Sequence, residues 1–177
     1  MPEYRELREE EISTGLFRHF IRRQEVGKCW RRENGEWKIK DAPFVDDWTP
    51  EDYKTLVRCL RRTCSSGGFV CAAFCEGELK GFVSVERGLF GGDNRYFDLS
   101  SLHVSQELRG HGIGTRLLQK ARAWAREQGA KKLYISAHSA VESQAFYRAM
   151  GCVEAQMYHP VHVAQEPFDC QLELACE

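Results

Sequence analysis

Residues 101–116 read SLHVSQELRGHGIGTR: a short apolar run typical of a strand, then three glycines, then the start of a helical pattern. Glycine loses more conformational freedom on folding than any other residue, so glycines at positions 110, 112 and 114 need a compensating role. The first turn of a helix offers N–H groups without intrahelical partners and about half a positive charge from its dipole. We therefore predict that this loop holds an anion, such as a phosphate group, on backbone N–H groups.

The charges around the glycines favour a pyrophosphate as the anion. Arg109, His111 and Arg116 are positive or can become positive. The Walker loop does not match, because no Gly-Lys-Ser/Thr follows, and the G-x-G-x-x-G spacing of dinucleotide-binding loops does not match either. The alternative is a glycine-rich turn that only joins a strand to a helix. The arginine before the glycines and the helical pattern after them favour the anion site.

The length and charge of the chain limit the classes of protein to which it can belong. Its 177 residues suit one domain, over residues 1–177, with a full hydrophobic core. The net charge of -1 argues against a dedicated nucleic-acid binder. No apolar run approaches the ~20 residues of a membrane helix, and the charged N-terminus lacks the apolar segment of a secretory signal. We therefore expect a cytoplasmic protein that binds neither nucleic acid nor a membrane.

The eight cysteines contain no C-x-x-C pair and no paired zinc-ligand spacing, so we expect no metal site. His159 and His162 could supply two ligands, although histidines beside a proline in a loop-like segment are more often incidental. Several cysteines lie inside apolar runs such as FVCAAFC, where a thiol behaves as a small hydrophobic group. Reduced, structural cysteines are therefore expected, and a nucleophilic cysteine is the alternative.

The N-terminal third is expected to contain a helix, an irregular segment and a second helix. Residues 10–25 repeat their apolar positions with helical spacing, whereas residues 26–48 show no regular pattern. Thr49 and Pro50 have the residue types of an N-cap and a first helical position, and helical spacing of apolar residues follows them.

The rest of the chain alternates between strand and helix patterns. The expected elements are an antiparallel hairpin around Glu76-Gly77, a strand over 95–104, a helix over 115–128, a strand over 133–137, a helix to Met150 opened by a capping box from Ser139 to Glu142, and a last strand over 168–174. The predicted fold class is α/β (α+β): one domain whose central mixed, mostly antiparallel sheet is flanked by helices.

Two motifs together resemble those of the GNAT N-acetyltransferase superfamily. RGHGIG, residues 109–114, fits the family's Arg/Gln-x-x-Gly-x-Gly/Ala motif, and QAFYRAMGC, residues 144–152, is similar to its FY-x-x-x-GF segment. They lie in the family's order and at about its spacing, and the resemblance covers roughly residues 68–155. It implies that this region is an acyl-CoA-binding core. The co-substrate would be acetyl-CoA or another acyl-CoA, without a metal, and the acetyl group would pass directly to a primary amine.

The resemblance also implies which residues bind the co-substrate. Backbone amides of the glycine loop would hold the pyrophosphate, and the preceding strand would pair with the pantetheine arm and polarise the thioester carbonyl through an N–H. The matching positions are Leu102, His103, Val104, Arg109, Gly110, His111, Gly112, Ile113, Gly114, Thr115, Ser143 and Tyr147. Ala140 stands where the family commonly has an asparagine, so that side-chain hydrogen bond to the cofactor is in question.

Asp98 is the predicted general base. A lysine-type amine has a pKa of ~10.4, so its neutralisation at pH 7 costs roughly 4–5 kcal/mol and benefits from a positioned base. Asp98 precedes Val104 by six residues, an offset at which several family members carry an acid or a histidine. Strand alternation would place Asp98 on one face with Ser100, Leu102 and Val104 if no bulge intervenes. The alternative is a solvated or structural carboxylate, with Glu86 as a weaker substitute for the base.

Tyr147 is the predicted general acid. It matches the family's tyrosine that donates a proton to the departing CoA thiolate. The alternative is a buried aromatic residue on the same helix face as Phe146 and Met150.

The acceptor would be a small-molecule amine or an amine of a peptide or protein. Aromatic residues between positions 26 and 50 could form a wall beside Asp46 and Asp47, or could simply anchor this segment to the core; they are Trp30, Trp37, Phe44 and Trp48. A second class remains open, namely a catalytically silent acyl-CoA-binding sensor or scaffold, but Asp98 and Tyr147 favour the enzyme. The acyl chain length is open, and so is the oligomeric state, for which a homodimer is a common choice.

Overall fold

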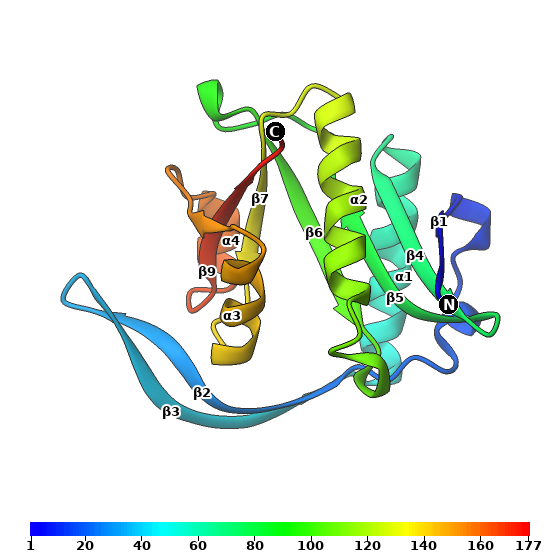
Figure 1. Cartoon of the computed structure of the whole chain (residues 1–177), viewed down its shortest axis with the longest axis horizontal. Coiled ribbons are helices and arrows are strands. Elements are labelled where there is room, and N and C mark those ends of the chain that lie inside the picture. Colours follow the sequence, from blue (N-terminus) through cyan, green and yellow to red (C-terminus); the bar gives the residue numbers. More distant parts are fainter.

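A seven-stranded sheet forms the centre of the molecule in the computed structural model, which describes residues 1–177 (Figure 1). The strand order is β1-β4-β5-β6-β7-β9-β8, and all neighbouring strands are antiparallel except β6 and β7. This confirms the predicted fold class. The strands are β1 (Glu3–Glu6), β4 (Phe69–Cys75), β5 (Glu78–Val85), β6 (Tyr96–Val104), β7 (Lys132–Ala137), β8 (Val153–Glu154) and β9 (Cys170–Ala175).

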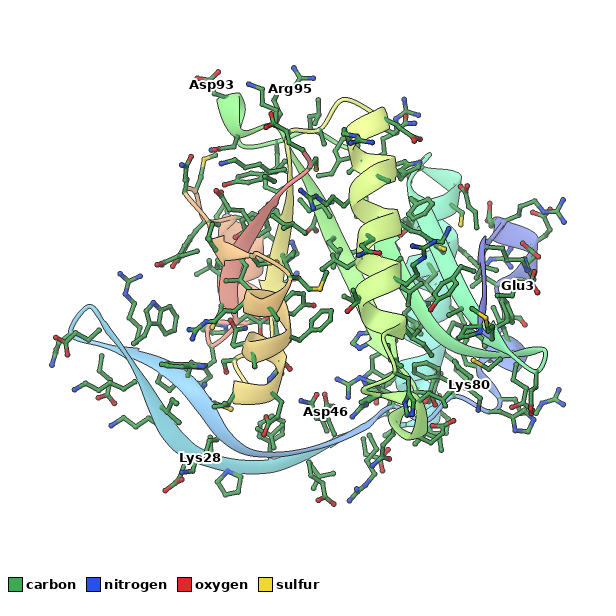
Figure 2. All side chains as sticks on the ribbon, in the orientation of Figure 1. Glu3, Lys28, Asp46, Lys80, Asp93 and Arg95 are labelled. Carbon is green, nitrogen blue, oxygen red and sulfur yellow. The ribbon has the colours of Figure 1, made fainter.

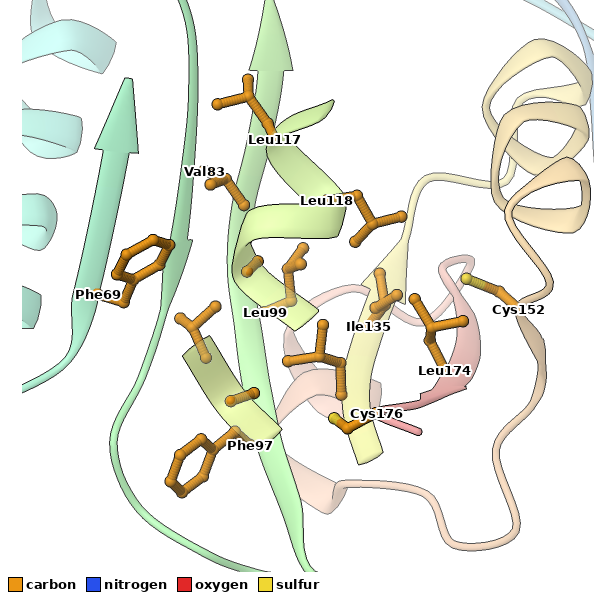
Figure 3. Packing of buried hydrophobic residues seen from close by; sticks show 14 of the residues in the cluster. Phe69, Val83, Phe97, Leu99, Leu117, Leu118, Ile135, Cys152, Leu174 and Cys176 are labelled. Atoms are coloured by element: carbon orange, nitrogen blue, oxygen red, sulfur yellow. The ribbon is translucent and has the colours of Figure 1, made fainter. Parts of the chain in front are cut away.

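Four α-helices and two large apolar clusters complete the domain. The helices are α1 (Pro50–Ser65), α2 (Ile113–Glu127), α3 (Val141–Ala149) and α4 (Pro160–Gln165). On one face of the sheet, Leu117 and Leu118 of α2 share a buried cluster with Val83 and Leu99 (Figure 3). Alternate residues of β4, together with Leu79 and Phe82 of β5, join a second cluster with α1 and the N-terminal segment. None of the helices is both long and apolar enough to cross a membrane.

The helix expected over residues 10–25 is wrong. Only short 3-10 turns form there, at Glu9–Glu11 and Thr14–Phe17, and a strand begins at Arg23. Ser13, Thr14 and Gly15 lie in the middle of this segment, and all three are weaker helix formers than alanine or leucine. The apolar side chains are nevertheless buried in the cluster with α1, so their spacing reports burial rather than a helix.

The segment expected to be irregular is a long β-hairpin. Strands β2 (Arg23–Glu33) and β3 (Glu36–Asp47) pair with each other and not with the main sheet. Asn34 and Gly35 form the turn with φ angles of 51° and 80°, as a type I′ hairpin turn requires. Asn-Gly was the sequence signal for this hairpin. The hairpin curves away from the sheet and passes below α3 (Figure 1), and most of its residues are exposed, which explains its lack of an apolar pattern.

The hairpin is attached to the start of α3, where it replaces the expected capping box. The Trp30 N–H donates to the Ser139 carbonyl (2.8 Å), and Arg31 donates to the Ser139 hydroxyl (2.7 Å). The N-cap of α3 is therefore Ala140, without a side-chain cap, and the prediction of Ser139 as cap is wrong. The cap predicted for α1 is confirmed, since the Thr49 side chain accepts a hydrogen bond from the N–H of Asp52.

The predicted elements from residue 69 onward are confirmed with small changes in their limits. The β4–β5 hairpin turns at Glu76 and Gly77, which have φ angles of 52° and 81°. Strands β6, β7 and β9 and helices α2 and α3 lie where their patterns placed them. The short elements β8 and α4 were not predicted.

Strands β6 and β7 separate after a short paired segment. They pair only from Tyr96 to Asp98 on β6, whereas β6 remains paired with β5 as far as Val104. From Leu99 onward, the edge of β6 that faces β7 therefore has no strand partner. This divergence, visible in Figure 1, opens the sheet at its centre.

A bulge at Ser100 changes which residues share a face of β6. Ser84 opposes Ser101 and the next residue, Val85, opposes Leu99, so Ser100 has no partner across the ladder. Leu99 and Leu102 consequently both pack towards the cluster on the α2 side. The expectation that Asp98 shares a face with Leu102 and Val104 is wrong, because the extra residue reverses the alternation.

Candidate active site

A cavity of about 1130 Å³ occupies the gap between the diverging strands. Its walls come from β6, the glycine loop and first turn of α2, the end of β7, α3, the base of the β2–β3 hairpin and the turn before β9. Segments distant in the sequence thus meet in one site. Asp46, labelled in Figure 2, lies at the base of the hairpin, near the open end of this gap.

The glycine loop has the geometry of an anion cradle. Gly110 and Gly112 have φ angles of 80° and 83°, and a Cβ atom at either position would meet no atom within 4 Å. Glycine is therefore required by the backbone conformation and leaves the loop surface open. Gly112 is the N-cap of α2 and provides no side-chain cap, so the N–H groups of the first turn remain available. These features fit a diphosphate.

Two arginines, Arg109 and Arg22, bring positive charge to the side of the loop that faces the cavity, whereas Arg116 does not line it. Arg109 donates its Nε–H to the carbonyl of Val104 (3.2 Å), which fastens the loop to the end of β6. Burial and the neighbouring guanidinium of Arg22 lower the pKa of Arg109. Both arginines line the cavity. His111 does not line it; its Nδ1 lies 3.0 Å from the carbonyl oxygen of Arg109, so that nitrogen carries the proton.

The unpaired end of β6 presents Leu102, His103 and Val104 to the cavity. Arg22 donates its Nε–H to Nδ1 of His103 (3.2 Å) and binds the Asp46 carboxylate through Nη2 (2.9 Å). Burial and the two arginines lower the pKa of His103 to about 3. Since Nδ1 accepts a hydrogen bond, the proton of this neutral imidazole is on Nε2.

Helix α3 contributes Tyr147 and Ser143 to the opposite wall. Burial raises the pKa of Tyr147, so its hydroxyl is protonated at neutral pH. The ring packs against Phe146 with an edge-to-face geometry, at a centroid distance of 5.2 Å. Ser143 accepts a hydrogen bond from Gln24 of the hairpin (3.4 Å), a further link across this end of the cavity.

Asp98 lies outside the cavity lining. Its Oδ2 is 2.8 Å from Nε2 of His162 on α4, and its Oδ1 is buried without a hydrogen-bond partner. The hydrogen bond with Asp98 raises the pKa of His162. Ser100 does line the cavity, and its hydroxyl donates to Glu86 (2.8 Å). The role of Asp98 as general base therefore stays a prediction. Asp98 could contact an acceptor directly only if its hydrogen bond with His162 opened.

The expected aromatic wall is reduced to one residue. Trp48 and Asp46 line the cavity, whereas Trp30, Trp37 and Phe44 do not. Trp30 and Trp37 instead pack against the main apolar cluster and under arginine side chains. No cluster of three or more His, Cys, Asp or Glu side chains is arranged to hold a metal ion.

Several polar residues of the cavity could not be predicted from the sequence. They come from the base of the hairpin, the end of β7 and the turn before β9, and they are Arg22, Gln24, Ser136, His138, Glu166 and Asp169. No local motif marks them. They face the cavity only because β9 returns beside β7 and the hairpin crosses the start of α3.

The family model described as the acetyltransferase (GNAT) family matches residues 30–152. The chain belongs to this family. The match includes both the glycine loop and the segment around Tyr147, so the resemblance of the two motifs is confirmed. No curated protein matches this chain.

Solved GNAT structures share the fold over nearly the whole chain. Nourseothricin acetyltransferase is 18% identical, with a TM-score of 0.73 and coverage of 99% of both chains. A protein assigned as a streptothricin acetyltransferase from Bacillus anthracis, crystallised with acetyl coenzyme A, is 16% identical, with a TM-score of 0.73 and coverage of 99% of this chain and 98% of that one. An aminoglycoside acetyltransferase from an uncultured soil sample is 20% identical, with a TM-score of 0.58 and coverage of 90% and 95%. At these identities the similarity concerns the fold.

Proposed function

We propose that this protein transfers the acetyl group of acetyl-CoA directly to the primary amine of a small molecule. The observation that carries the proposal is the position of the glycine loop. The loop and the N-terminus of α2 open onto the gap between β6 and β7, and Tyr147 faces the same cavity. The site thus combines an anion cradle, an unpaired strand edge and a proton donor.

Each part has a distinct task in binding the donor. The backbone N–H groups of Ile113, Gly114 and Thr115 would hold the pyrophosphate, because they belong to the first turn of α2 and have no intrahelical partner. The free edge of β6 would hold the pantetheine arm through backbone hydrogen bonds and polarise the thioester carbonyl. Acetyl-CoA supplies the thioester whose carbonyl carbon is attacked.

Tyr147 would act as general acid towards the leaving group. A tyrosine that stays protonated at neutral pH has a proton to donate to the departing sulfur, and the thiol that this sulfur forms has an ordinary pKa of ~8.5. The thiolate is already a fair leaving group, so the benefit from Tyr147 is moderate.

The cavity favours a cationic amine. Two arginines, Arg22 and Arg109, line it together with five acidic residues. The acidic residues are Glu25, Asp46, Glu142, Glu166 and Asp169. The names of the structural relatives, which refer to nourseothricin, streptothricin and an aminoglycoside, support a small molecule over a protein lysine as acceptor.

The test is release of CoA thiol from acetyl-CoA in the presence of L-lysine, spermidine, cadaverine or a lysine-containing peptide. We expect amine-dependent release and an acetylated product by mass spectrometry, with faster turnover of the small amines. Binding of acetyl-CoA without turnover on any amine would instead support the silent sensor or scaffold module.

A further inference from the structure

A chain of four hydrogen bonds crosses the interior behind the cavity and ends on Asp169. The backbone N–H of His159 donates to the Tyr134 hydroxyl (2.8 Å), and this hydroxyl donates to Oε1 of Gln171. Gln171 donates from Nε2 to the Ser136 hydroxyl (3.0 Å), which donates to Oδ2 of Asp169 (3.0 Å). Tyr134 and Gln171 are buried.

The direction of every bond in this chain is determined. A backbone N–H can only donate, so Tyr134 must direct its own proton to the oxygen of Gln171. The amide nitrogen of Gln171 then donates to the oxygen of Ser136, and the single hydroxyl proton of Ser136 points to Asp169. Because buried polar groups are costly unless satisfied, this arrangement orients one carboxylate with several interior groups.

Asp169 is also the carboxylate of the cavity that remains partly buried without a cationic partner. Glu25, Glu142 and Glu166 are exposed, and Asp46 is bound to Arg22. No protein donor reaches Oδ1 of Asp169, whose side chain lines the cavity.

We propose that Asp169 is the general base, which binds the ammonium group of the acceptor and removes its proton, and that Ser136, Gln171 and Tyr134 position it. This inference rests on the proposed acetyl transfer. Burial raises the pKa of Asp169 and so makes its carboxylate a stronger base than an exposed aspartate.

The reaction balances as follows. The acceptor R–NH₃⁺ gives one proton to Asp169, and the freed electron pair of nitrogen forms a C–N bond with the thioester carbonyl carbon. The C–S bond breaks and its electron pair leaves with sulfur, which takes a proton from Tyr147; Tyr147 regains one from the product nitrogen. Asp169 returns its proton to solvent, so the products are the amide, CoA thiol and H⁺.

Other charged and titratable groups surround Asp169. His138 at the end of β7 and His162 on α4 lower its pKa, against the larger effect of burial. Tyr147 on α3 and Glu166 in the turn before β9 line the same cavity. A pH profile of the native enzyme therefore contains several groups, and variants are needed to isolate Asp169.

The experiment compares Asp169→Asn with the native enzyme on two amines. One is whichever alkylamine of the panel above turns over fastest; the other is hydroxylamine, which is largely neutral at pH 7 and needs no base. We expect kcat/KM for the alkylamine to fall about 100- to 1,000-fold, as loss of a general base does, and to fall less than about tenfold for hydroxylamine. Asp93→Asn, at the end of the molecule remote from Asp46 (Figure 2), should change neither.

The pH profile of kcat/KM in Ser136→Ala is a second measurement, and it distinguishes a role of Ser136 in positioning Asp169 from a purely structural role. Loss of its hydrogen bond to the ionised form raises the pKa of Asp169, so the acid limb of the kcat/KM profile should move to higher pH. That limb should disappear in Asp169→Asn.

The outcomes separate this inference from the proposed function. The assignment of Asp169 as the base is overturned if the native enzyme turns over and Asp169→Asn shows no loss of kcat/KM, or shows equal losses for both amines. If instead Asp98→Asn shows the amine-selective loss, the base is Asp98 and not Asp169. Binding of acetyl-CoA by the native enzyme without turnover of any amine overturns the acetyltransferase proposal and the base with it.

Discussion

Arg22 donates its Nε–H to Nδ1 of His103 across 3.2 Å, and this bond joins the base of the β2–β3 hairpin to the unpaired end of β6. The same guanidinium binds Asp46 and lies over the Trp48 ring at 5.3 Å. His103 is consequently held neutral at the cavity wall, although histidine commonly titrates near physiological pH.

This neutral histidine predicts a pH dependence of stability. Its folded pKa of about 3 lies below the unfolded value of ~6.5, so between these values the unfolded chain binds a proton that the folded chain does not. The contribution of His103 to the free energy of unfolding should therefore fall as pH drops below ~6.5, by about 2 kcal/mol at pH 5.

Urea unfolding of the native protein and His103→Gln at pH 5 and pH 7 measures this effect. Glutamine can still accept the hydrogen bond from Arg22 but does not titrate. His162, whose pKa is raised, acts in the opposite direction in both proteins and cancels in the comparison. An identical pH dependence of the free energy of unfolding in the two proteins would show that His103 is not held neutral in the folded protein.

Gly112→Glu should abolish binding of CoA. The side chain would place a carboxylate at the N-terminus of α2, where it would compete with the pyrophosphate and repel it. Gly112→Gln has the same size and the same strain at a φ of 83°, so the difference between the two variants isolates the charge. Calorimetric titration with CoA should show weaker binding for Gln and none for Glu. Normal affinity of Gly112→Glu would show that the loop does not hold the pyrophosphate.

Tyr147→Phe should lower kcat by about tenfold or more while the affinity for CoA stays nearly unchanged, because only the proton donor is removed. Single-turnover rates with acetyl-CoA, together with CoA titration, separate the two effects. Tyr4→Phe, in the edge strand β1, is a matched control and should behave as the native enzyme. An unchanged turnover in Tyr147→Phe would exclude the general-acid role.

Gly81→Ala should destabilise the protein and weaken CoA binding together. A Cβ atom at Gly81 would lie 2.8 Å from the Ile113 side chain and 3.0 Å from that of Leu117, so the first turns of α2 would have to shift. We expect a loss of about 1–3 kcal/mol in the free energy of unfolding. Gly88→Ala meets no atom within 4 Å and serves as the control. Unimpaired CoA binding in a destabilised Gly81→Ala would show that the loop tolerates movement of the helix.

The sequence by itself determined the parts of this protein that depend on neighbouring residues. The glycines at 110 and 112 precede a helix and need positive φ, and the apolar spacing of α2 follows directly, so the glycine turn and the start of the helix could be predicted. The β4–β5 hairpin and the cap at Thr49 are equally local features. Asn34-Gly35 also contained a local signal, which the exposed and polar strands around it obscured.

Only the tertiary structure decided the acceptor side of the cavity. The bulge at Ser100 depends on pairing with β5, and it turned Asp98 away from the face of Leu102. Asp169 faces the cavity because β9 returns beside β7, where a serine from one strand and a glutamine from the other complete its hydrogen-bond chain. Such contacts join residues more than 30 positions apart, and no local pattern of residue types encodes them.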